Sequence, residues 1–311
     1  MGPLGLMANS ITVSENHRPM LATLQWFNPL VEFGPISVEQ PSSALPLLLV
    51  LPGLDGSGVT AWTQYPELAR SYDVRALSIA PSDRSSYDEV VADIASKVTE
   101  AADAGREVYV LGESMGAGFA LTLGSGMPVA DRISGLVLVS PATGWDRTWL
   151  GRMSEQLVAL PDLWLTLAIT LTSYQLLDRK QLTTTMRRIT TGERSPLLEG
   201  DERTAYAWRV VRELPARLAS PAGTVRHRIA QWAGPSMRAG FGERLAALRT
   251  PLLVVAGTAD LRVPAEEEAR RLQAEAPVPT VVHLVDSAGH AGVTDDRLDL
   301  RLVMEGWRRT L

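Results

Sequence analysis

The sequence predicts an α/β fold: a mostly parallel sheet with helices on both faces and an inserted helical cap. Short apolar runs alternate with segments of helical periodicity, which is typical of repeated βα units and therefore of a parallel sheet. The alternation stops between residues 144 and 249 and then resumes. With 311 residues, 45% of them hydrophobic, the chain can bury one large core.

These patterns divide the chain into a lead-in, a core in two pieces and a cap. We expect residues 1–20 to be a disordered lead-in, residues 21–143 and 250–311 to form the α/β core, and residues 144–249 to form the helical cap. The lead-in has neither the basic and apolar pattern of a signal peptide nor the composition of a transit peptide. We therefore expect a cytoplasmic protein.

The core elements follow from apolar patterning and from glycine and proline breaks. Two short strands are expected first, at 24–33 and 36–40, separated by Gly34 and Pro35. Leu47–Leu51 is an unbroken apolar run, as expected for a strand buried on both faces. Before the cap we then expect a glycine-rich loop at 52–58, helices at 62–70, 87–104 and 115–125, and strands at 74–79, 107–111 and 133–139. After the cap we expect strands at 252–256 and 280–285, and helices at 264–276 and 295–309, the last capped by Asp295 or Asp296.

One strand-to-helix turn carries a serine in a recognisable pattern. Gly112-Glu-Ser-Met-Gly116 fits G-x-S-x-G, the nucleophile elbow of α/β-hydrolases, with an apolar strand before it and a helix after it. In such an elbow a strained backbone pushes the hydroxyl out above the sheet. We therefore expect Ser114 to be a catalytic nucleophile.

A serine nucleophile needs a base and a carboxylate that holds the base in place. In this fold the partners follow in the order Ser, Asp, His, each after the carboxyl end of a strand. Asp260 lies in a turn after the strand expected at 252–256, and His290 lies in a glycine-flanked loop after the strand expected at 280–285. We predict that Ser114, Asp260 and His290 form a triad.

Elimination supports this choice of base, because the chain has only four histidines. His17 lies in the lead-in, His227 is expected to be a solvated cap residue, and His283 falls inside a strand. His290 alone lies in a loop after a strand, and its ordinary pKa of about 6.5 predicts loss of activity as the pH falls. Asp286 is the alternative carboxylate.

The donors for the oxyanion are expected to be backbone N–H groups. We predict the N–H of Met115, directly after the nucleophile, and that of Leu54 in the loop after Leu47–Leu51. Gly53 lets this loop approach the substrate. Asp55 either braces the turn or contacts the substrate.

The cap contains fifteen residues without a charge, Leu163–Leu177. This stretch is short for a bilayer span, which takes about 20 apolar residues. It is expected to be a helix buried between cap and core, or else one that lines an acyl pocket or contacts a lipid surface. Trp164, in this stretch, is expected to contact the substrate.

Composition excludes several other chemistries. The chain has no cysteine, which excludes disulfides, thiolate catalysis and cysteine metal sites. The glycine-rich loop lacks the Lys-Ser/Thr ending of a phosphate-binding loop, and we expect no metal and no cofactor. A net charge of −5 without a basic stripe argues against a nucleic-acid partner. The oligomeric state is left open.

Several motifs together resemble the phytyl ester synthase/diacylglycerol acyltransferase family of plastids and photosynthetic microbes. In chain order they are Trp26-Phe-x-Pro29, Leu51-Pro-Gly-Leu-Asp-Gly-Ser-Gly58, Pro81-Ser-Asp-Arg84, Gly112–Gly116 and Ser140-Pro-Ala-Thr143. The resemblance runs from about Trp26 to the C-terminus and is weak within the cap. It implies the same three triad residues and an acyl ester or lipid substrate.

The resemblance leaves two reactions open. Plant members of the family continue into a second, acyltransferase-like domain with an H-x₄-D motif, whereas this chain ends at Leu311. The first expectation is a serine esterase or lipase-like enzyme that acts on an ester with an apolar chain. The alternative is an acyltransferase that passes the acyl group to a long-chain alcohol or diacylglycerol. A non-catalytic ligand receptor on the same fold is a third hypothesis.

Overall fold

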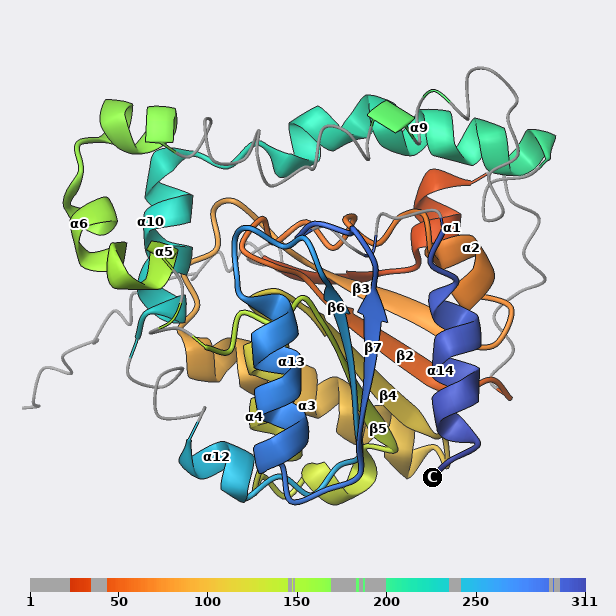
Figure 1. Ribbon diagram of the computed structural model, residues 1–311. Coiled ribbons are helices and arrows are strands. Elements are labelled where there is room, and N and C mark those ends of the chain that lie inside the picture. Colours follow the sequence, from red (N-terminus) through yellow and green to blue (C-terminus); the bar gives the residue numbers. More distant parts are fainter. Residues whose placement is uncertain are drawn as a thin grey trace, which may run out of the picture.

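The described strands form one twisted, mostly parallel sheet with helices on both faces, which confirms the predicted fold class (Figure 1). The computed structural model describes residues 23–34, 44–144, 147, 149–168, 183–184, 187, 200–234, 242–290, 293 and 297–311. The seven strands lie in the order β1-β3-β2-β4-β5-β6-β7, and only β1 pairs antiparallel. Their bounds are β1 Leu24–Phe27, β2 Leu47–Leu51, β3 Asp73–Ile79, β4 Val108–Glu113, β5 Gly135–Val139, β6 Leu252–Gly257 and β7 Thr280–Val285.

The helices fall into core elements and elements between β5 and β6. The core helices are α1 Pro29–Phe33, α2 Tyr65–Leu68, α3 Tyr87–Asp103, α4 Gly116–Gly124, α13 Ala265–Glu275 and α14 Leu300–Arg308, with a 3-10 turn at Ala130–Arg132. Between β5 and β6 lie α5 Trp149–Arg152, α6 Ser154–Ala159, α9 Asp201–Leu218, α10 Ala222–Trp232 and α12 Glu243–Ala246. Within the described part of the chain, no helix combines the length and apolar content needed to cross a bilayer.

Two hydrophobic layers hold the sheet between the helices. In β2, Leu47, Leu49 and Leu51 face a layer shared with α3, α4 and α13, while Leu48 and Val50 face a layer shared with α1, α2 and α14. Every residue of β2 is buried. This is why the strand reads as a continuous apolar run rather than an alternating one.

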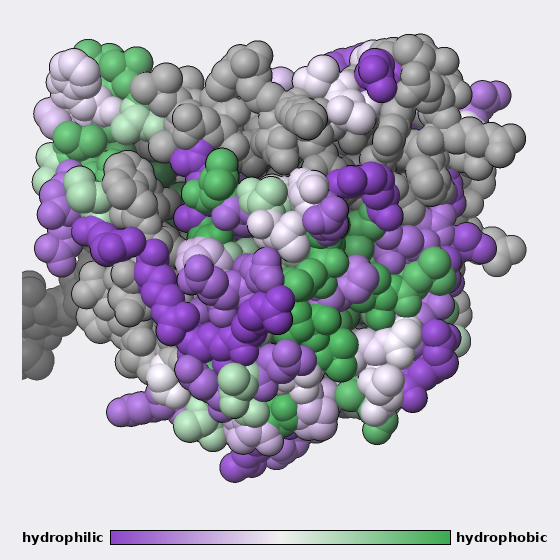
Figure 2. Space-filling model, in the orientation of Figure 1, coloured by the Kyte–Doolittle hydropathy of each residue, from purple (hydrophilic) through white to green (hydrophobic). Residues whose placement is uncertain are grey.

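The edge strand β7 is less covered than the central strands. Its residues are only partly buried up to Val285, and Val281 is 37% exposed. Figure 2 shows apolar side chains gathered beside α13, over β7, next to a hydrophilic surface on α13. The difference follows from position, because an edge strand has a neighbour on one side only.

The N-terminal elements differ from the expectation of two strands. The first strand ends at Phe27, since the Asn28 side chain accepts hydrogen bonds from the N–H of Leu30 (2.9 Å) and of Val31. Asn28 thereby caps α1, which has Pro29 at its first position, a favoured place for proline. The expected strand at 36–40 lies outside the described residues.

Two predicted helices are shorter than expected. Only Tyr65–Leu68 of the helix expected at 62–70 is helical; the preceding residues form turns, with Trp62 N–H bonded to Val59 O at 3.1 Å. The last helix begins at Leu300, and Asp299 caps it by accepting the Leu302 N–H at 3.0 Å. The caps expected at 295 and 296 are therefore wrong, and those residues lie outside the described part.

Most of the inserted helices lie near the edge of the sheet where the parallel strands end, whereas α12 lies toward the opposite edge (Figure 1). In Figure 1, α9 runs across this edge, while α5, α6 and α10 stand to one side of it. The Tyr206 hydroxyl on α9 donates to Trp62 O at 3.0 Å, so this helix is tied to the core. The carboxyl ends of the strands thus face α9.

Candidate active site

Ser114 lies in a sharp turn between β4 and α4. Its φ is +52°, in the left-handed region that a residue with a side chain seldom adopts. After the turn, α4 packs very closely against β2, which glycine at position 116 permits: a Cβ there would lie 2.5 Å from Leu51 O. The Ser114 N–H donates to Val139 O at 2.9 Å, which ties the elbow to the neighbouring strand β5.

The structure brings Ser114, His290 and Asp260 together in a hydrogen-bonded row. His290 Nε2 lies 3.1 Å from Ser114 Oγ, and His290 Nδ1 lies 2.9 Å from Asp260 Oδ2. The Asp260 side chain is 1% exposed, and its Oδ1 accepts the N–H of Arg262 (2.8 Å) and of Val263 (3.2 Å). The carboxylate is thus fixed by its own turn. With Nδ1 held by Asp260, Nε2 is free to accept the proton of Ser114.

Contacts from two other loops hold the loop that carries His290. The N–H of Ala259 donates to Ala288 O at 2.9 Å, joining the Asp260 turn to the His290 loop. On the other side of His290, the Thr63 hydroxyl donates to Val293 O at 2.8 Å. The imidazole is therefore positioned by its neighbours, although glycines flank it in the sequence.

The pKa of His290 is raised above its ordinary value. Burial of the ring lowers the pKa, but the charge and hydrogen bond of Asp260 and the charge of Glu113 raise it and outweigh burial. The expectation of an unperturbed histidine is therefore wrong. The reason is the buried carboxylate at 2.9 Å.

Glu113 is a buried acid that the sequence reasoning missed. It directly precedes Ser114, is 5% exposed and accepts a hydrogen bond from the Thr60 hydroxyl. Burial and the charge of Asp55 raise the pKa of Glu113 to about 7, against the opposing effects of Thr60 and His290. The only signal in the sequence is its place inside the G-x-S-x-G pattern.

The loop after β2 lies directly beside the nucleophile. A Cβ on Gly53 would lie 3.3 Å from Ser114 Cβ, so the loop backbone passes next to the serine. Among the described residues we find no acceptor for the N–H of Leu54 or of Met115. Two unpaired backbone donors next to a serine hydroxyl are the elements of an oxyanion hole.

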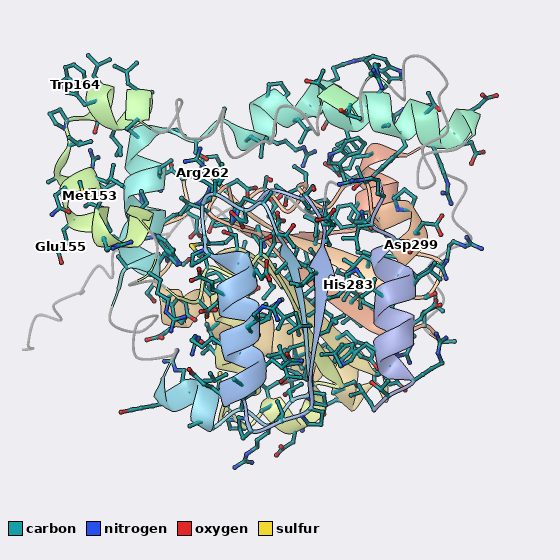
Figure 3. The ribbon with its side chains drawn as sticks, in the orientation of Figure 1. Met153, Glu155, Trp164, Arg262, His283 and Asp299 are labelled. Carbon is teal, nitrogen blue, oxygen red and sulfur yellow. The ribbon has the colours of Figure 1, made fainter. Side chains whose placement is uncertain are left out.

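The structure places the two remaining candidates differently. Asp55 Oδ2 accepts the Ser57 N–H at 2.7 Å and also the Ser57 hydroxyl, so Asp55 braces the turn. Trp164 is 61% exposed. In Figure 3 it lies at the outer end of the cap helices, apart from Arg262 in the Asp260 turn. This position gives Trp164 no contact with the hydrogen-bonded row. Most of the apolar stretch that contains it, from residue 169, lies outside the described residues.

The other two described histidines lie elsewhere. His283 is in β7 as expected, and burial lowers its pKa. His227 is partly buried on α10, where its Nε2 lies 3.0 Å from Ser85 O, so the expectation of a solvated residue is wrong. Among the described residues, no group of three or more acidic, histidine or cysteine side chains is placed to hold a metal ion.

Comparisons with known proteins identify the family of the chain. The model of the family described as serine aminopeptidase, S33, matches residues 80–297. Two curated relatives from Arabidopsis thaliana are similar. Phytyl ester synthase 1, chloroplastic, is 27% identical over 281 residues, which cover 88% of this chain and 38% of the relative. Phytyl ester synthase 2, chloroplastic, is 34% identical over 140 residues, or 44% of this chain and 19% of the relative. The chain thus spans less than half the length of these relatives.

Solved structures share the fold at low sequence identity. MenH from S. aureus is 16% identical with a TM-score of 0.56, and the match covers 93% of this chain and 99% of that one. The esterase EaEST from Exiguobacterium antarcticum is 15% identical with a TM-score of 0.54, and the match covers 92% and 94%. At these identities the likeness concerns the fold alone.

Proposed function

The chain belongs to the serine aminopeptidase S33 family of α/β-hydrolases, and on this premise we propose that it is a serine hydrolase that cleaves acyl esters with an apolar chain. The observation that carries the proposal is the row Ser114–His290–Asp260, with contacts of 3.1 Å and 2.9 Å. Such a row lets a neutral imidazole take the proton of an otherwise weak nucleophile.

In the proposed reaction, Ser114 Oγ attacks the ester carbonyl while His290 Nε2 takes its proton. Asp260 stabilises the imidazolium that forms, and the N–H groups of Leu54 and Met115 donate to the oxyanion. The intermediate collapses as His290 returns the proton to the leaving alcohol, which leaves an acyl group on Ser114. Water, deprotonated by His290, then attacks this ester, releases the acid and restores the serine.

The test of this proposal is covalent labelling and turnover of Ser114→Ala. We expect a fluorophosphonate to label the wild-type chain at Ser114, and no labelling of the variant. Turnover of a soluble ester should fall by about 10⁶-fold, as for other serine triads. Wild-type turnover in Ser114→Ala would exclude the proposal. Absence of labelling in the wild-type chain would favour a non-catalytic ligand receptor.

A second candidate is acyl transfer to a long-chain alcohol or diacylglycerol. The curated relatives are named for the synthesis of phytyl esters, and phytol is a long apolar alcohol. The same residues serve this reaction if the alcohol replaces water in the second step. Product partition from a labelled acyl donor, with and without added long-chain alcohol, separates the two. A labelled ester that appears only with the alcohol supports transfer, and free acid alone supports hydrolysis.

We also propose that the cap contacts the surface of a lipid phase that holds the substrate. Leu163, Trp164 and Leu167 are 68%, 61% and 46% exposed, and they lie on one stretch of helix. Adjacent apolar side chains at a surface suit a peripheral lipid contact. We propose a cytoplasmic location, although the named relatives are chloroplastic. Fractionation of the natural host decides between these compartments.

A further inference from the structure

Helix α10 docks on the core through a row of polar side chains, in addition to Trp232, which joins the hydrophobic core. Four residues at helical spacing, which therefore share one face, donate hydrogen bonds to backbone carbonyls of core segments: Thr224, His227, Arg228 and Gln231. Thr224 reaches Pro81 O, and His227 and Gln231 both reach Ser85 O. The helix is thus fastened to the loop after β3.

Arg228 is the member of this face that also reaches the loop beside the nucleophile, residues 52–58. One guanidinium nitrogen contacts Leu54 O at 3.2 Å and also Asp55 O, and the other donates to Ile79 O at 2.7 Å. One side chain of the cap therefore joins loop 52–58 to the end of β3. The two carbonyls it binds belong to Leu54 and the next residue.

The burial of Arg228 is unusual for a cation. The residue is 2% exposed, and among the described residues no carboxylate forms an ion pair with it. Burial lowers the pKa of the guanidinium, against the charges of Asp55 and Asp83. Taking a charge out of water without an ionic partner is costly. The carbonyl dipoles of loop 52–58 and of Ile79, at the end of β3, offset this cost. The stability of the buried side chain therefore depends on the position of these carbonyls.

The loop has space for the guanidinium only because residue 56 is glycine. Gly56 has a φ of +67°, and a Cβ there would lie 2.4 Å from a guanidinium nitrogen of Arg228. The Gly56 N–H donates to Gly53 O at 3.0 Å, so the Gly53 carbonyl points into the turn. Because C=O and N–H of a trans peptide point in opposite directions, the Leu54 N–H of the same peptide points out of the turn.

We propose that Arg228 is a positioning residue for the oxyanion hole. Its guanidinium holds the carbonyls of Leu54 and Asp55 on the cap side of the loop. These carbonyls belong to the two peptides that follow the Gly53–Leu54 peptide, so the contact restrains the loop in the conformation in which the Leu54 N–H faces the substrate carbonyl oxygen. The inference rests on the proposed function, since it assigns Leu54 as an oxyanion donor. With this role for Arg228, α10 helps to position the oxyanion donor in addition to covering the site.

The test compares Arg228→Met with Arg226→Met, which removes an arginine from the same helix. Within the described part of the chain, the hydrogen bonds of Arg226 go to cap residues, at 2.8 Å to Val158 O, Leu160 O and Asp162 Oδ1. We measure kcat and KM on a soluble ester per fluorophosphonate-labelled site, and the affinity for a trifluoromethyl ketone, whose adduct carries an oxyanion. Counting labelled sites removes the effect of unfolded protein.

We expect Arg228→Met to lower kcat per site by about 10²-fold, on the scale of losing one oxyanion donor. Affinity for the ketone should fall in parallel, while KM changes little. Arg226→Met should leave all three quantities at the wild-type values. A wild-type kcat per site in Arg228→Met, or an equal loss in Arg226→Met, would overturn the inference.

If Arg228→Met does not fold, Arg228→Lys replaces it. Lysine keeps the charge and the apolar stem but lacks the fork that reaches three carbonyls at once. We expect its kcat per site to fall while its melting temperature stays near that of wild type, and a wild-type kcat would again overturn the inference. The proposed function fails separately, when Ser114 itself is neither labelled nor required for turnover.

Discussion

The imidazole of His290 and the carboxylate of Asp260 are 2.9 Å apart, and the Asp260 side chain is 1% exposed. The pair therefore acts as one unit that is largely shielded from water. Burial alone would favour the neutral ring, but the adjacent charge outweighs it and raises the pKa of His290 above 6.5. The protonated ring accordingly adds to folding stability below its unfolded pKa of about 6.5. This contribution is lost as the pH rises through the higher folded pKa.

The first prediction concerns the acid limb of the pH–rate profile. Only neutral His290 can accept the serine proton, so kcat/KM should fall as the pH drops through a pKa above 6.5. Asp260→Asn removes the charge that raises this pKa. We expect the acid limb to move to lower pH and turnover to fall by about 10⁴-fold. Asp286→Asn changes an exposed carboxylate that precedes the His290 loop and should move neither quantity. An acid limb that stays in place in Asp260→Asn contradicts this account.

The second prediction concerns Glu113, whose pKa burial raises to about 7 from its ordinary value of 4.5. Between these values the folded state binds more protons than the unfolded chain, so stability falls as the pH rises. Glu113→Gln keeps an acceptor for Thr60 without the charge. It should raise the free energy of unfolding at pH 8 by up to about 3 kcal/mol and have much less effect near pH 4. Urea unfolding at both pH values measures this, and a loss of stability at pH 8 would refute it.

The third prediction concerns the close approach of α4 to β2. A Cβ on Gly116 would lie 2.5 Å from Leu51 O and 2.7 Å from Pro52 O, and both are backbone atoms that cannot swing aside. Gly116→Ala should cost about 1–3 kcal/mol in unfolding free energy, as overpacking does, and should lower kcat by moving Met115. At Gly242 a Cβ meets nothing within 4 Å. Gly242→Ala should therefore stay within about 0.5 kcal/mol of wild type. Equal costs at the two positions would rule out the steric explanation.

The fourth prediction concerns Trp164, which is 61% exposed. Because it lies apart from the Asp260 turn in Figure 3, Trp164→Ala should leave kcat and KM for a soluble short-chain ester unchanged. On substrate held in vesicles its KM should rise, because apolar surface that contacts the lipid is lost. Trp208→Ala is the matched control, since Trp208 is 41% exposed on α9. A changed KM for the soluble ester would instead return Trp164 to the substrate site.

The strands were predictable because their signal is local. β2 and β7 have the expected bounds, Leu47–Leu51 and Thr280–Val285, since a run of buried apolar residues between breaks has few other interpretations. Helix α1 was not predicted because it begins where the Asn28 side chain accepts hydrogen bonds from backbone N–H groups, and a pattern of apolar residues does not indicate such a cap. The same holds for the cap at Asp299.

The residues of the site likewise divide into those that local sequence patterns identify and those that they do not. Sequence order, loop position and the glycine pattern were enough to name Ser114, Asp260 and His290, which the structure brings within hydrogen-bond distance of each other. Glu113 and Arg228 were not found, because a buried charge is recognised by what surrounds it. Their partners come from segments far away in the chain, so the spacing of residues in the sequence does not indicate these contacts.

The chain leaves the sheet at the end of β5 and re-enters it at β6, and these two strands are neighbours in register, with Leu136 opposite Leu252. Because these strands run parallel, the insert leaves at the carboxyl end of β5, Val139, and must return to the opposite edge of the sheet, where Leu252 begins β6. An insert long enough to make this return can vary in the part that lies at the carboxyl edge, so we expect that part to be exchangeable and to alter which substrates reach Ser114. A replacement for the segment between β5 and β6, however, must do more than have a suitable length. It must supply a cation in place of Arg228. Otherwise the protein gains a new specificity but loses the contacts that hold loop 52–58 in position.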